Sequence, residues 1–178
     1  MNGIIDDINA QIENAIRCLF GDEMPFLGFT LAKPVQITDD TTDMSMPAII
    51  DNNGECHYVF TDDSYAIGWY HRLLSRNYSA KPGFGDNNLD VKNDEILLVC
   101  WGLSNVLQMQ AEEVESKVIV PSIPGNALLV SSNFDAKSVL SGEFRNINYL
   151  NKPEEFIFSV KYRVQTAFNR KCKNKLTS

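Results

Sequence analysis

The most constraining feature of the sequence is the alternation over residues 156–168, FIFSVKYRVQTAF. Successive side chains of a β-strand point to opposite faces, so one face of this segment collects its aromatic and aliphatic residues. The other face carries Lys161, Arg163 and Gln165. A strand of this kind needs a sheet and a covering layer to bury its aromatic face. We expect that face to pack under a helix at 108–120, and the polar face to be left for a neighbouring subunit or a channel.

The length of 178 residues suffices for one domain with a sizeable core, which we place at 1–169, followed by a basic C-terminal tail at 170–178. No apolar run approaches the roughly 20 residues that span a bilayer. The acidic, periodic N-terminal segment also lacks the regions of a signal peptide. The four cysteines are scattered without a CxxC pair, and we expect Cys18 and Cys100 to be buried free thiols in a reducing cytosol.

The charge of the chain is unevenly distributed. Its net charge is −7, and residues 170–175 carry four positive charges, so removing that segment leaves −11. An acidic body repels nucleic acid as a specific ligand, and we expect any DNA contact to come from the tail or a local patch.

The order of expected elements defines a fold class. Apolar residues at three- and four-residue spacing predict a helix over 2–20 that Gly21 ends. Asn53-Gly54 predicts a hairpin between strands at 46–51 and 55–61. Residues 64–74 favour a strand, with a helix as the alternative. Further strands are expected at 34–38, 94–102 and 127–134, and an extended segment at 143–150. A helix is expected at 108–120, and a short helix or a turn at 135–140. Exposed loops are expected at 39–47 and 77–93. Together they predict a single α+β domain, with a mostly antiparallel sheet and amphipathic helices packed on one face.

No group of residues has the pattern of a catalytic centre. Glu55 and His57 share a strand face, but no further ligands with zinc-site spacing accompany them. A nucleophile elbow, a dinucleotide fingerprint and a P-loop are all missing from the sequence. We therefore expect no enzyme activity, no catalytic residues, no cofactor and no metal. The aromatic residues Trp69, Tyr78 and Phe84 lie in or beside expected loops, where they either fold back on the core or anchor a partner.

The element order resembles a family of viral structural proteins. An N-terminal amphipathic helix precedes hairpins, the segment EILLVCWGLSN, a glutamate-rich helix, the strand ALLVSSNFD and the long strand EEFIFSVKYRVQTAF. This order is similar to that of the ring-forming neck and tail proteins of tailed bacteriophages, most of all tail-terminator and tail-completion proteins and the ring proteins of crAss-like phages. The likeness spans the first helix and about the last half of the chain.

The resemblance implies a structural virion protein, assembled in the host cytoplasm, that forms a homo-oligomeric ring in the neck or tail. Such head–tail connector or tail-terminator rings join the portal to the tail and bind neighbouring portal, connector or tail proteins. They surround passing DNA and contact it non-specifically, and no membrane partner is expected. In such a ring, the loops 39–47 and 77–93 would be arms to neighbouring subunits. Candidate interface residues are Trp69, Tyr78, Phe84, Lys161, Arg163, Arg170, Lys171 and Lys173.

Two alternatives stay open at this point. One is a small ligand-binding or hydrolytic α+β domain that uses the loop at 83–86 and the strand with Trp69 and His71. The other is an adaptor that binds a protein partner through its aromatic loops.

Overall fold

The computed structural model describes residues 3–38, 45–60, 65–81, 89–144 and 152–169, and all structural statements below concern these residues. Its centre is a five-stranded sheet with the order β1-β5-β6-β8-β7. β1 (Phe26–Phe29) runs parallel to β5, and all other pairs are antiparallel. The α+β class expected from the sequence is thereby confirmed.

Three long strands form the middle of this sheet. β5 (Ile67–Lys81), β6 (Leu89–Leu103) and β8 (Glu155–Asn169) each have 15 residues. β6 pairs with β8 along its whole length, from Leu89↔Asn169 to Leu103↔Glu155. The alternating segment at 156–168 is therefore a strand, as expected, and it lies between β6 and the edge strand β7 (Ala127–Asn133).

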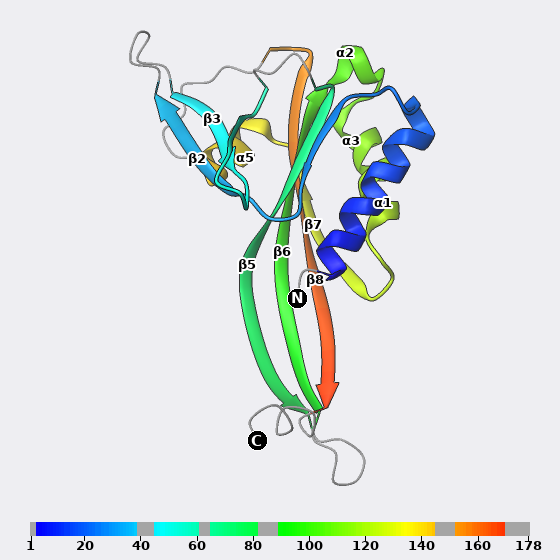
Figure 1. Cartoon of the computed structure of the whole chain (residues 1–178), viewed down its shortest axis with the longest axis vertical. Helices are drawn as coiled ribbons and strands as arrows, with labels where there is room; N and C mark the ends of the chain where they lie inside the picture. Colours follow the sequence, from blue (N-terminus) through cyan, green and yellow to red (C-terminus); the bar gives the residue numbers. More distant parts are fainter. Residues whose placement is uncertain (1–2, 39–44, 61–64, 82–88, 145–151, 170–178) are drawn as a thin grey trace.

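Helices cover one face of the sheet (Figure 1). α1 (Gly3–Phe20) packs on this face through a buried stripe of isoleucines, Ile5, Ile8, Ile12 and Ile16, which shares a core with residues of the sheet. A second helical run follows α2 (Ser104–Leu107) and consists of α3 (Ala111–Val114), the π-helical turn η1 (Glu115–Ile119) and α4 (Val120–Ser122). Val114 and Val118 of this run share a core with Phe158, Val160 and Tyr162 of β8, which confirms the expected packing of the long strand.

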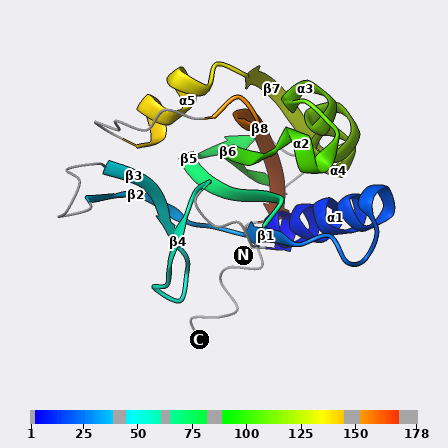
Figure 2. The same ribbon diagram turned by 90° about the horizontal axis from the view of Figure 1, so that it is seen from above.

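The opposite face has a different cover, visible from above in Figure 2. A small antiparallel sheet of β2 (Lys33–Thr38), β3 (Ser45–Ile50) and β4 (Cys56–Tyr58) lies there together with α5 (Ala136–Glu143). Ile49 of β3, Leu140 of α5 and Ile157 of β8 meet in a second core on this side. The Asn53-Gly54 hairpin is confirmed, with Gly54 at a φ of 86°.

Several expectations from the sequence are wrong. The loop expected at 77–93 is mostly strand, because β5 continues to Lys81 and β6 begins at Leu89. The strand favoured within 64–74 is confirmed from Ile67, where β5 begins, and only the helix given as its alternative is wrong for the described residues. Cys18 is exposed, whereas Cys100 is buried as expected. Among the described helices, none combines the length and the apolar character needed to cross a membrane.

Candidate functional site

The most distinctive part of the molecule is a three-stranded extension of the central sheet, here named the arm. It consists of 75–81 of β5, 89–95 of β6 and 163–169 of β8. β1 pairs only with Ile67–Tyr70 of β5, and β7 reaches β8 only as far as Val164. At 3.3 Å per residue, seven residues extend roughly 20 Å. Figure 1 shows the three strands continuing past the helices, so the arm projects from the body with a strand edge on each side.

One face of the arm is held together by Asp94. Arg76 binds both carboxylate oxygens of Asp94, with its Nε 2.8 Å from Oδ1 and a terminal nitrogen 3.2 Å from Oδ2. Lys92 lies two residues away on the same strand face, with its Nζ 2.5 Å from Oδ2. Burial alone would raise the pKa of Asp94, but the hydrogen bonds from Arg76 and Lys92 outweigh it and hold that pKa below its usual range. This pairing joins β5 to β6 on the arm.

The other face of the arm is held by Glu95. Lys161 Nζ lies 3.3 Å from one carboxylate oxygen, and an Arg163 nitrogen donates to the other at 3.4 Å. The hydrogen bond from Lys161 is the main cause of the lowered pKa of Glu95. Lys161 and Arg163 therefore share Glu95 as a counterion while staying partly exposed, and their role in an interface stays a prediction. This face is hollowed and polar, lined by Ser75, Asn77, Asn93, Glu95, Arg163 and Gln165.

Among the other candidate interface residues, Tyr78 and Trp69 differ sharply. Tyr78 lies on the arm with 58% of its surface exposed, in reach of a partner. Trp69 is fully buried, so its expected role as a surface anchor is wrong. Its ring stacks on Phe26, and its Nε1 donates a hydrogen bond to Asn9. Phe84, Arg170, Lys171 and Lys173 lie outside the described residues.

The edge strand β7 adds a surface that the sequence analysis missed. Leu128, Leu129 and Val130 are all exposed, Leu128 by 63%. β8 is the one strand that pairs with β7 among the described residues, and a bulge interrupts this pairing between Leu129 and Ser131. Three consecutive aliphatic residues could have pointed to this surface, since a strand with one covered face buries only alternate residues. An exposed aliphatic edge strand is a template for pairing with another chain.

His71 lies in a buried polar network rather than in an open site. Its Nε2 donates to Asn9 Oδ1, which also accepts the Trp69 indole, and its Nδ1 accepts from the Tyr162 hydroxyl, each at 2.9 Å. Burial lowers the pKa of His71 to about 3. The ring is therefore neutral at physiological pH and links α1, β5 and β8. These contacts assign His71 to the core.

A hollow of about 420 Å³ lies between α5 and the sheet. Two of its charged groups bind one another, because Arg72 pairs with Glu143 at 2.5 Å, and Glu143 also accepts the Tyr70 hydroxyl at 2.9 Å. A carboxylate held by an arginine and a tyrosine is a poor general base. This geometry gives little support to hydrolytic chemistry.

The hairpin of β3 and β4 brings together residues that the sequence analysis considered only in part. Glu55 and His57 share a side of the hairpin, as expected from their spacing, and Asp51 joins them from across the turn. Spacing rules for zinc sites did not point to Asp51, since the turn geometry places it there.

The chain as a whole matches no protein-family model and no curated protein.

Proposed function

We propose that this chain is a structural virion protein of a tailed bacteriophage, a subunit of an oligomeric ring in the neck or tail that joins the portal to the tail around the DNA channel. The observation that carries the proposal is the arm. A projecting three-stranded ribbon with polar faces adds little to a hydrophobic core. Its natural role is contact with other subunits.

The open strand edges supply the two different surfaces that a ring needs. β7 presents an aliphatic edge on one side of the sheet. On the other side, the edge of β5 that faces away from β6 has no described partner strand beyond Tyr70, which leaves the outer edge of the arm open, with Tyr78 exposed on that strand. In this proposal, β7 of one subunit pairs with the β5 edge of the next. Contacts between unlike surfaces generate a ring when the rotation closes.

The charge of the chain is compatible with a DNA conduit. Its net charge is −7, and a repulsive lumen lets DNA pass without adhering. The resemblance of the element order to phage neck and tail ring proteins is the second support. The position in the virion and the contacts with portal, connector or tail proteins are parts of this same proposal.

The test is quantification of the protein in purified particles of the phage that encodes it, combined with electron microscopy of the neck and tail. We expect a fixed copy number per particle and density for the chain at the head–tail junction or along the tail. Particles that lack the protein would contradict the virion role. A monomer that binds a small molecule in the hollow beside α5 would favour the ligand-binding alternative instead.

A further inference from the structure

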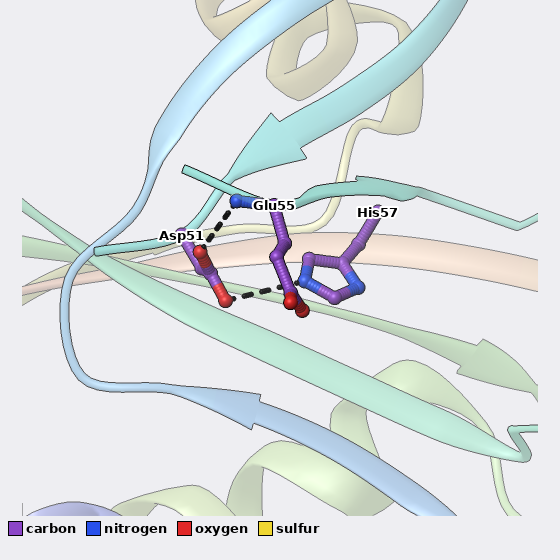
Figure 3. A group of neighbouring side chains, drawn as sticks. All are labelled: Asp51, Glu55 and His57. Carbon is purple, nitrogen blue, oxygen red and sulfur yellow. Dashed lines mark hydrogen bonds and ion pairs between the residues drawn. The ribbon is translucent and has the colours of Figure 1, made fainter. Parts of the chain in front are cut away.

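The hairpin between β3 and β4 gathers three groups that can bind a metal ion (Figure 3). The ligand atoms of Asp51, Glu55 and His57 all lie within 4.8 Å of one another. The backbone of the hairpin sets this spacing, because the Asp51 N–H donates to the Glu55 carbonyl at 3.0 Å and closes the turn. Glu55 and His57 are two residues apart, and so their side chains point to the same side.

The two carboxylate oxygens of Asp51 have separate roles. Oδ1 accepts the backbone N–H groups of Asn53 at 2.8 Å and of Glu55 at 2.9 Å, which fixes the orientation of the carboxylate. Oδ2 points at His57 and lies 3.3 Å from its Nε2. Only 11% of the Asp51 side chain is exposed. Burial alone would raise the pKa of Asp51, but the hydrogen bonds from Glu55, Asn53 and His57 outweigh that effect and hold the pKa below its usual value. The carboxylate is therefore ionised at neutral pH.

The imidazole of His57 is also held in place. The ring of Phe29 packs against it with 4.7 Å between the ring centroids. Among the described residues, no lysine or arginine forms an ion pair with Asp51 or Glu55. The two carboxylates and the imidazole therefore converge without a lysine or arginine ion pair in the described part of the chain, which is an electrostatic environment that a cation stabilises.

We propose that Asp51, Glu55 and His57 bind a divalent transition-metal ion of the Zn²⁺ class. Zinc binds imidazole nitrogen and carboxylate oxygen at about 2.0–2.2 Å, so neighbouring ligand atoms of a tetrahedral site are roughly 3.4 Å apart. The 3.3 Å between Asp51 Oδ2 and His57 Nε2 already matches that separation. The imidazole favours zinc over calcium and magnesium, which prefer oxygen ligands alone.

The three protein ligands leave a fourth position of the metal for water or for a group from another molecule. The bound ion would join β3 to β4, which share only three paired positions, at the end of the small sheet. It would therefore stabilise this hairpin, and its role does not depend on the proposed ring.

The test is isothermal titration of the full-length chain with ZnCl₂, in a background in which Cys18, Cys56 and Cys172 are serine so that thiolates do not compete. We expect one equivalent of zinc to bind and CaCl₂ not to displace it. His57→Ala is expected to weaken binding at least tenfold. Asp51→Asn keeps the oxygen that accepts the turn hydrogen bonds, and Glu55→Gln keeps the side-chain shape, so these two variants remove charge with the smallest change in the hairpin.

A second readout separates ligation from folding. Co²⁺ at the same site is expected to give the visible absorption of a nitrogen and oxygen ligand set, without thiolate charge transfer, and the signal should be lost in His57→Ala. Far-UV circular dichroism checks that each variant is folded. Absence of zinc binding by the parent protein would overturn the proposal, as would binding that is unchanged in Glu55→Gln, Asp51→Asn and His57→Ala.

Discussion

The hydroxyl of Tyr162 donates a hydrogen bond to Nδ1 of His71 across 2.9 Å in the interior of the sheet. The opposite nitrogen of the ring donates to Asn9 Oδ1, which has no proton to give, and this fixes the neutral tautomer. The long strand β8 is thereby tied to β5 and α1 through one uncharged histidine.

We predict that His71 makes the fold acid-sensitive. The unfolded chain binds a proton at this histidine near pH 6.5, whereas the folded protein resists protonation down to about 3. The unfolded state therefore holds more protons in this window, and the free energy of unfolding falls as the pH drops from 6.5 toward 3, by at most about 1.4 kcal/mol per pH unit. Urea unfolding measured across this range should show that slope.

The variant His71→Gln isolates this effect, because a glutamine can accept from Tyr162 and donate to Asn9 without titrating. We expect a lower stability at pH 7 and a smaller loss below pH 6.5. His57→Gln removes the other histidine of the chain and is the matched control. An equal pH slope in His71→Gln and the parent protein would refute the assignment.

A close approach of β1 to a buried tryptophan gives a second prediction. A Cβ added at Gly28 would lie 2.3 Å from the Trp69 ring, which is fully enclosed. Gly28→Ala should therefore cost about 2 kcal/mol of unfolding free energy through overpacking. Gly142→Ala in α5 meets no atom within 4 Å and should stabilise by about 0.5 kcal/mol. Chemical denaturation of the two variants compares them directly, and equal stabilities would contradict the packing described for Gly28.

The ion cluster on the arm gives a third prediction. Asp94→Asn leaves Arg76 and the largely buried Lys92 without their shared counterion, which should cost about 2 kcal/mol. We expect the loss to be local, as faster amide hydrogen exchange at 89–95. Glu113→Gln breaks the exposed pair with Lys117 and should change stability by less than about 0.5 kcal/mol. Equal amide hydrogen exchange at 89–95 in Asp94→Asn and Glu113→Gln would contradict a stabilising role of the ion cluster on the arm.

The basic tail gives a fourth prediction, based on charge. Truncation after Asn169 removes Arg170, Lys171, Lys173 and Lys175. The urea midpoint should stay unchanged, while assembly or DNA retention should weaken. The difference in assembly or retention between the truncated and full-length chains should shrink as salt is added, because salt screens the charges of the tail. Normal assembly of the truncated chain would refute a role of the basic tail in assembly.

The regular parts of this fold could be predicted because their residue patterns are strong. The isoleucine stripe of α1, the Asn53-Gly54 turn and the alternation of β8 each specify one local structure. The arm was missed because 77–81 and 89–93 contain asparagine, serine and charged residues, which are typical of loops. These segments are strands because they pair with each other and because 89–93 also pairs with β8, and such pairing is not visible in the sequence of either segment alone.

The candidate sites were harder to predict for a related reason. Trp69 was a candidate interface residue because it lies beside an expected loop, yet Gly28 leaves room for its buried ring. The salt bridges of Lys161 and Arg163 with Glu95 depend on the register of β6 against β8. Asp51 approaches His57 only once the hairpin has formed.

The central claim is tested most directly by the mass of the purified full-length chain, measured by native mass spectrometry and light scattering over a range of concentrations. We expect a closed oligomer of discrete mass. Leu128→Asp at the β7 edge should dissociate it, whereas Val106→Asp, at an exposed aliphatic residue of α2, should not. A monomer at every concentration, or an oligomer that Leu128→Asp leaves intact, would contradict the account.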